Sequence, residues 1–346
     1  MSIPPGKLAR WYKHVLSGFN SPLEKRRRHQ HDVQVSNPKG IEKITVRVPI
    51  MEVDNIGENM AIDEKQIGKE MVTILSNRDT GKIAMMAKSL KSSELFEVLS
   101  RYQKKTYEVK SITRDLSNSY DWLARQAFPN ATQTADKFHI LKHTYDAMQQ
   151  VRVRFRQELL RDKRIQYEAF KAEKAERRVH CRETGEPYKK ERFVYDTQFA
   201  GNGESYLEIL ARSRPFLYMP RENWSESQRE RAEALFEIYP DIEDAYELCM
   251  EFRTWYSKKN IKKAIELMRQ KLKRWYSNVK SADIDEMLNV KSMIERHEGV
   301  ILNYFKEGMT NAIAENVNSR IQRFFNQNNG TNDIEFFYFR LKKLFA

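Results

Sequence analysis

Three carboxylates are the residues in this chain best suited to chemistry, and the first two follow apolar runs. Asp63 ends the run that begins at Met60, and Asp115 ends the run that begins at Val109. Two carboxylates brought together repel each other unless a cation lies between them. Ligands made only of oxygen favour Mg²⁺ or Mn²⁺ over zinc. The pair therefore indicates a divalent metal site, although a single Asp is more often a helix or turn cap.

Glu315 is the predicted third acid. It lies in a segment expected to be helical, where Asn311, Glu315 and Asn318 are spaced i, i+4 and i+7 and share one face. An acid flanked by amides, just before the basic and aromatic residues 320–325, suits metal ligation beside a phosphate. The alternative is a polar, solvated face that binds nothing.

Asp136 also ends a short predicted strand, so it is an alternative to Asp115 as the second catalytic acid. His139 and His143 are spaced i and i+4 and could bind zinc, but no third or fourth ligand stands nearby in the sequence. We expect His139 to hydrogen-bond within the site or to contact DNA.

Short apolar runs separated by turn signals predict the strands that position these acids. Strands over 60–63, 70–75 and 82–87 should form an antiparallel meander. A helix, a strand ending at Asp115, a helix stopped by Pro129, a strand over 131–135 and a further helix follow. This order is that of an RNase H-like fold, in the α/β (α+β) class, with a mixed five-stranded sheet. Open sheets build sites at the carboxyl ends of their strands, where Asp63 and Asp115 should meet.

The rest of the chain is expected to be mostly helical. A polar stretch over 171–202 should interrupt the helices, and 214–220 should be extended. Amphipathic spacing, as at Phe252 and Trp255, favours core packing over a cofactor site. The predicted organisation is a basic N-terminal arm over 1–40, the first part of the core over 41–140, a helical insertion over 141–305, and a C-terminal region over 306–346 that carries the last catalytic helix and completes the core.

Charge and composition limit the partners. The 346 residues carry a formal charge of +13, which favours a polyanion such as nucleic acid or an anionic membrane surface. The sequence has no apolar stretch of eighteen residues and no secretory signal, so we expect a cytoplasmic protein with no membrane partner. Its two cysteines cannot build a zinc finger. The basic residues expected to contact DNA phosphates are Lys25, Arg26, Arg27, Arg28, Arg320 and Arg323.

Six short motifs lie in the chain at 61–65, 77–81, 113–120, 128–131, 135–140 and 310–318. In this order they resemble the ISL-three family of insertion-sequence DDE transposases. By resemblance the family's catalytic acids fall on Asp63, Asp115 and Glu315, and its Asp-Lys-Phe-His element falls on Asp136 to His139.

The resemblance implies an RNase H-like catalytic domain interrupted by a long helical insertion. It implies two Mg²⁺ (or Mn²⁺) ions, cleavage and strand transfer at element ends, and a homodimer that holds terminal inverted repeats and target DNA in a bacterial nucleoid. The chain departs from the family in lacking a cysteine-rich N-terminal region and in having Gln322 where Lys is common. We therefore expect a short variant whose end-recognition module is either truncated or encoded as a separate DNA-recognition subunit. The alternatives are a nuclease or domesticated relative that no longer transposes, and a non-enzymatic, basic helical DNA-binding protein.

Overall fold

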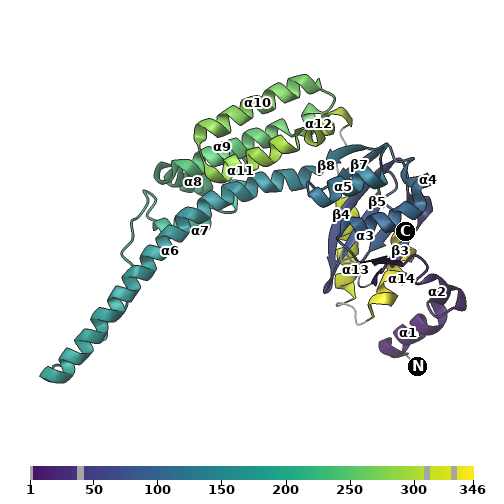
Figure 1. Ribbon diagram of the computed structural model, residues 1–346. Helices are drawn as coiled ribbons and strands as arrows, with labels where there is room; N and C mark the ends of the chain where they lie inside the picture. The colour runs from purple at the N-terminus through teal and green to yellow at the C-terminus, as the bar shows by residue number, and fades with distance from the viewer. Residues whose placement is uncertain (1–2, 37–42, 308–311, 329–332) are drawn as a thin grey trace. The chain divides into compact units, whose positions relative to one another are not determined.

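The computed structural model describes residues 3–36, 43–307, 312–328 and 333–346. The chain divides into two compact units (Figure 1). The first unit comprises residues 1–140, 261–265 and 297–346, and the second comprises 141–260 and 266–296. No helix within the described ranges combines the length and apolar character needed to cross a membrane.

A six-stranded mixed sheet forms the core of the first unit, in the order β3-β6-β5-β4-β7-β8. The meander β4-β5-β6 is antiparallel, and β7 and β8 run parallel to β4. The predicted class and RNase H-like strand order are confirmed, and the short edge strand β3 makes six strands where five were expected. The strands are β3 Ile50–Met51, β4 Asn59–Ile67, β5 Glu70–Asn77, β6 Ile83–Ala87, β7 Ser111–Arg114 and β8 Thr132–Ala135, with a separate hairpin of β1 Val33–Ser36 and β2 Lys43–Val46.

β4 differs from its prediction because it does not end at Asp63. It runs four residues further, through Lys65 to the buried Ile67, and turns at Gly68, whose φ of 62° is one that glycine adopts readily. The next turn was predicted correctly. The side chain of Asn77 accepts N–H bonds from Asp79 and Thr80 at 2.8 and 3.1 Å, which closes the loop between β5 and β6. Asp63 is therefore held in the middle of a paired strand.

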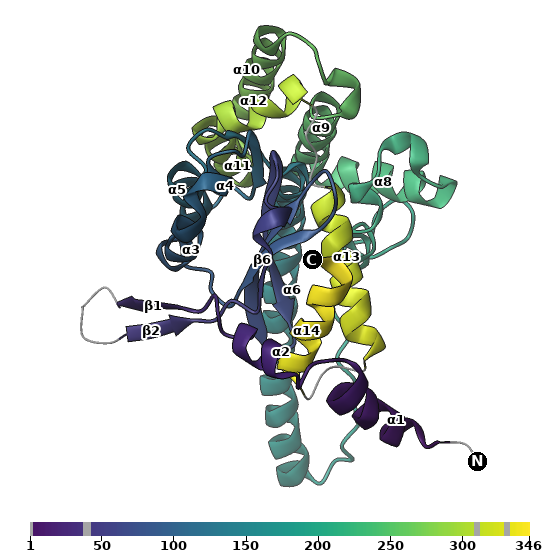
Figure 2. The same ribbon diagram turned by 90° about the vertical axis from the view of Figure 1, so that its right-hand side faces the viewer.

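Helices cover both faces of the sheet, as Figure 2 shows on either side of β6. Alternate strand residues such as Ile62 and Ile112 pack with the helices α3 and α5. Residues that point to the other face of the sheet, such as Ile67 and Ile74, pack with α13 and α14. The helices of this unit are α1 Pro5–Trp11, α2 Pro22–Arg27, α3 Ser92–Leu99, α4 Gln103–Thr106, α5 Asn118–Ala127, α12 Glu298–Glu307, α13 Ala312–Gln327 and α14 Ile334–Phe345, with a π-helix over Tyr12–Leu16.

The second unit is helical, as predicted, but two of its segments differ from their predictions. The polar interruption predicted over 171–202 begins later, because the Lys, Glu, Ala and Arg residues from Lys171 favour helix and α6 continues to Thr184, just before Gly185. Residues 185–198 lie outside helices and strands, which confirms the later part of that prediction. The segment 214–220 contains a short 3-10 turn rather than an extended strand. The helices are α6 Lys137–Thr184, which begins in the first unit, α7 Tyr206–Arg212, α8 Glu226–Ile238, α9 Pro240–Trp255, α10 Ile265–Ala282 and α11 Asp285–Arg296.

Aromatic side chains fill the core of the second unit. Phe252 and Trp255 are buried, which confirms that their helical spacing reflects packing. Trp275 lies 4.9 Å from Phe252, ring centroid to ring centroid, and its indole N–H donates to the carbonyl of Leu248 at 2.9 Å. The Trp275 ring is thus buried while its polar atom keeps a partner.

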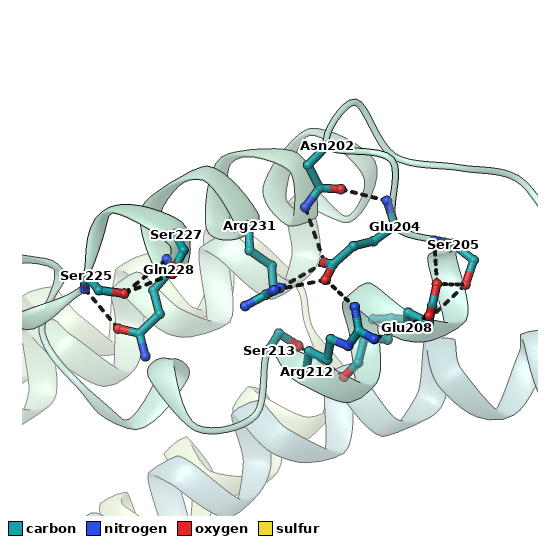
Figure 3. A network of polar contacts seen from close by, with 11 residues as sticks. Asn202, Glu204, Ser205, Glu208, Arg212, Ser213, Ser225, Ser227, Gln228 and Arg231 are labelled. Atoms are coloured by element: carbon teal, nitrogen blue, oxygen red, sulfur yellow. Dashed lines mark hydrogen bonds and ion pairs between the residues drawn. The ribbon is translucent and has the colours of Figure 1, made fainter.

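Glu204 anchors the loop that leads into α7 (Figure 3). It accepts from Arg231 at 2.8 and 2.9 Å and from Arg212 at 2.7 Å. The Arg231 hydrogen bond, with the help of Arg212, lowers the pKa of Glu204 to about 2. The neighbouring Ser205 and Glu208 form a capping box that begins α7.

Because the folded-state pKa of Glu204 lies below its unfolded value of about 4.3, its contribution to stability is complete above that pH. The contribution is lost as the pH falls toward 2. We expect the melting temperature of wild type to exceed that of Glu204→Gln at pH 7, and the gap to close between about pH 4.5 and 2. Thermal melts across this range measure the gap. A gap that stays constant with pH would contradict the assignment.

Candidate active site

Strand register brings three aspartates to one edge of the site. β4 and β7 pair Met60 with Ile112 and Ala61 with Thr113, and the same offset, continued by two residues, sets Asp63 opposite Asp115. β7 and β8 pair Arg114 with Ala135. The next position sets Asp115 opposite Asp136, and the Asp136 N–H donates to the carbonyl of Arg114 at 2.8 Å. Equivalent positions on paired strands point to the same face, so the three carboxylates share a surface.

The helix α13 contributes the remaining acid and an amide to this surface. Val317 and Ile321 pack α13 against the sheet, on the face that carries Asp63. The side-chain amide of Asn318 donates to Asp63, and Glu315 lies one helical turn earlier. The structure therefore brings Asp63, Glu315 and Asn318 together. Asn311, also predicted to support the site, lies outside the described residues.

Asp136 and His139 form a hydrogen-bonded pair at the start of α6. The Asp136 side chain is buried, and one of its oxygens is 2.9 Å from Nδ1 of His139. The other oxygen accepts the backbone N–H of Phe138 at 2.9 Å. Both oxygens of Asp136 thus have protein partners, whereas Asp115 is half-buried and uses one oxygen to accept the N–H of Leu116 at 2.6 Å.

A buried arginine fixes the end of β7 just before Asp115. The Arg114 side chain is fully buried and forms an ion pair with Asp121 of α5. It also donates to Gln133 at 2.7 Å and to the carbonyl of Asp115 at 2.8 Å. Burial lowers the pKa of the Arg114 guanidinium, and Asp121 opposes that shift. These bonds tie the backbone of Asp115 to both β8 and α5.

The site is electrostatically coupled. Burial raises the pKa of Asp63, and the charge of Asp136 adds to the rise, while the N–H of Glu64 and the charge of His139 oppose it. Burial also raises the pKa of Glu315, with further contributions from Asp136 and Asp63. The hydrogen bond that His139 donates to the Asp136 carboxylate raises the pKa of His139 to about 9. The raised pKa values of Asp63 and Glu315 mean that their ionised forms are disfavoured in this surface. A cation bound there would stabilise the ionised carboxylates.

The donor chemistry fits a hard divalent cation, since Asp63, Asp115 and Glu315 supply only oxygen ligands. Within the described residues, no group of three His, Cys, Asp or Glu side chains is placed closely enough to hold a metal ion. The three acids therefore share a face without forming a closed set of ligands.

An open hollow of about 680 Å³ lies beside Asp63, between β4 and α13. Lys65 and Arg323 supply its positive charge, and Asn318, Ser319 and Gln322 supply amide and hydroxyl groups. Lys65 was not predicted to belong to the site. Its position two residues after Asp63 on a strand places it on the same face, and that alternation was the available signal.

The predicted DNA-contacting residues fall in different environments. Lys25, Arg26 and Arg27 are exposed in the last turn of α2. Arg28 is partly buried, with its guanidinium 3.8 Å from the ring centroid of Phe19. It also lies 3.6 Å from the Glu335 carboxylate, so Arg28 holds α2 against α14. Arg320 is exposed and lies 4.5 Å from the ring centroid of Phe345, and Arg323 lines the hollow beside Asp63.

The profile of a known protein family matches this chain. It is the ISL3 (ISL-three) profile, described as a transposase, and it matches residues 60–341. No curated protein and no solved structure matches the chain. The matched residues include all four acids of the site and make up well over half of the sequence. This protein is therefore a member of the ISL-three family of transposases.

Proposed function

We propose that this protein is a Mg²⁺-dependent transposase that cleaves DNA at insertion-sequence ends and joins the freed 3′ ends to target DNA. The observation that carries the proposal is the register of β4 and β7, which pairs Ala61 with Thr113 and, continued by two residues, sets Asp63 opposite Asp115 just after β7. Glu315 and Asn318 on α13 complete the same surface. Three oxygen-donating acids on one face are what metal-assisted phosphoryl transfer requires.

Asp63, Asp115 and Glu315 would hold the metal, as two Mg²⁺ or Mn²⁺ ions. When bound, such ions activate a water, stabilise the leaving 3′-oxygen and neutralise the phosphate. Asp115 is better suited than Asp136 to ligation, because both oxygens of Asp136 are already bonded to His139 and Phe138.

The protein's own groups position the substrate. The raised pKa of His139 keeps a positive charge beside the acids at neutral pH, where it can attract a DNA phosphate. Lys65 and Arg323, which line the hollow, can hold the DNA backbone there. Asn318 orients the Asp63 carboxylate through its hydrogen bond.

The wider setting follows from this activity. Because two element ends must be joined, we propose a homodimer that acts on terminal inverted repeats and target DNA inside a bacterial cell. We also propose a separately encoded DNA-recognition subunit, which should be recovered when the complex that forms on the element ends is purified. The basic arm over 1–40 and the insertion over 141–305 are proposed as DNA-contacting parts around a core over 41–140 and 306–346.

The roles of Asp115 and Asp136 can be separated by substitution. We expect Asp115→Asn to lower Mg²⁺-dependent cleavage of a duplex carrying the element end by roughly a thousandfold. Asp136→Asn should lower it only about 10- to 100-fold, because Asp136 acts through His139. Single-turnover cleavage with and without EDTA measures both effects. A larger loss from Asp136→Asn would reverse the assignment, and cleavage that persists in EDTA would overturn the proposed reaction.

A further inference from the structure

The second half of α6 and the segment that follows it form an arm with no interior of its own. We call residues 153–199 the arm. All of them are described, and none is buried. A helix with so little burial is stabilised by the helix propensity of its residues and by a few local contacts. Its exposed side chains do not pack in a core and can contact a partner.

The segment after α6 covers only one side of the helix. The ring of Phe193 lies 5.2 Å from Tyr167 and 5.7 Å from Phe170, centroid to centroid. The backbone N–H of Asp196 donates to Gln166 at 3.0 Å, and the Tyr195 hydroxyl lies 3.1 Å from Asp162. The half-buried residues that make up this covered side of the helix are Leu159, Lys163, Gln166, Phe170, Lys174, Arg177 and Cys181.

A second line of side chains runs along the uncovered helix surface and is strongly basic. Its members are three or four residues apart, so they fall on one flank of the helix. All are exposed, and five of the seven are Lys or Arg. We call this line the basic flank; it consists of Arg161, Arg164, Glu168, Lys171, Ala175, Arg178 and Arg182.

Most of these cations have no acidic partner. Lys171 pairs with Glu168 at 3.3 Å. Arg161, Arg164 and Arg182 form no hydrogen bond or ion pair in the part of the chain that the structure describes. Unpaired arginines spread along an exposed helix keep their full attraction for an external anion.

The acids of the same helix lie on a different flank. Glu183 directly follows Arg182, which places it about 100° around the helix. Glu158 and Glu176 lie on the same side as Glu183, since they precede it by 25 and 7 residues, about seven and two turns. All three are exposed and also lack ion pairs in the described structure. The arm therefore separates its charges instead of mixing them.

We propose that the basic flank of α6 binds the phosphate backbone of duplex DNA, as a contact surface of its own in the second unit. This inference rests on the proposed function, which supplies DNA as substrate. From Arg161 to Arg182 the helix rises about 32 Å, close to the roughly 34 Å of one turn of B-DNA. Arg178 and Arg182 also line a hollow of about 370 Å³ with Tyr188, Cys181 and Glu186, where a phosphate could be held from two sides.

The test compares two triple variants of the full chain. Arg161→Gln/Arg164→Gln/Arg182→Gln removes three unpaired cations, and Glu158→Gln/Glu176→Gln/Glu183→Gln removes three unpaired acids from the other flank. Affinity for a labelled 30-base-pair duplex is measured in EDTA at several salt concentrations. We expect the basic triple to weaken binding roughly 10- to 100-fold at 0.1 M salt and to reduce the salt slope by about 2 to 3, since each phosphate contact contributes about 0.9. The acidic triple should keep the wild-type slope.

Two outcomes would overturn the proposal. Wild-type affinity and slope in the basic triple would overturn the proposal. The proposal would also be overturned if sedimentation showed that wild type is a dimer, that both triple variants are monomers, and that DNA binding is unaffected. That result would favour pairing between two copies of the arm. Circular dichroism confirms that each variant keeps its helix. Asp63→Asn should bind DNA with the full wild-type salt slope. If the protein fails to cleave DNA but the basic triple still lowers the salt slope, the proposed reaction is wrong and the DNA-binding flank stands.

Discussion

Asp63→Asn is expected to lower single-turnover strand cleavage in Mg²⁺ by about a thousandfold or more, while folding and DNA affinity stay intact. The change keeps the shape of the side chain and removes the charge that a cation would meet. Burial and Asp136 already raise the pKa of Asp63, so the protein holds this charge at a cost. A neutral side chain should therefore leave the unfolding midpoint unchanged or higher. Loss of activity without loss of stability is typical of a residue kept for function.

Glu64→Gln is the matched control for this experiment. Glu64 is the next residue of β4, is exposed, and points to the opposite face of the sheet. We expect its cleavage rate to stay within a few-fold of wild type. Equal losses from Asp63→Asn and Glu64→Gln would show that any change in this strand disturbs the enzyme, and would remove the argument for a specific acid.

Asp121→Ala should destabilise the protein by about 3 kcal/mol, because it leaves the charge of the fully buried Arg114 without its carboxylate. This loss is at the low end of what breaking a buried ion pair costs, because the Asp121 side chain is 28% exposed. Urea unfolding at pH 7 measures the loss. Cleavage should fall as well, because Arg114 also holds the carbonyl of Asp115 at 2.8 Å.

Arg125→Ala removes the other partner of Asp121 and serves as the control. Its side chain is 64% exposed, at 2.9 Å from Asp121, and an exposed pair of this kind contributes less than about 1 kcal/mol. We expect little change in either stability or cleavage. Similar losses from Asp121→Ala and Arg125→Ala would mean that the buried arginine draws little stability from its ion pair.

The order of the sheet could be predicted because its strands are short apolar runs between recognisable turns. The turn from Asn77 to Gly81 was predicted correctly. The structure shows its cause, because the side-chain oxygen of Asn77 accepts hydrogen bonds from backbone N–H groups of the loop. The end of β4 was not, because Lys65 is polar and breaks the apolar run although the strand continues to Ile67. The length of α6 was also missed, since charged residues in a helix without burial resemble those of a loop.

The sequence predicts which strands carry the acids of the site, but it does not predict the side-chain contacts among them. Topology alone places Asp63 near Asp115, but only the register shows that Asp136 is level with both. Sequence does not reveal that His139 and Phe138 occupy both oxygens of Asp136. Arg114 was missed for a similar reason, because an arginine at a strand end is usually exposed and this one is fully buried.

Iron-directed backbone cleavage tests most directly the claim that Asp63, Asp115 and Glu315 hold the catalytic metal. Fe²⁺ binds the same oxygen ligands as Mg²⁺ and Mn²⁺, and with peroxide and ascorbate it generates radicals that cut the chain close to the ion. We predict fragments with ends near residues 63, 115 and 315, suppressed by excess Mg²⁺ and lost in Asp63→Asn. Cuts that cluster elsewhere, or that persist unchanged in Asp63→Asn, would contradict the account.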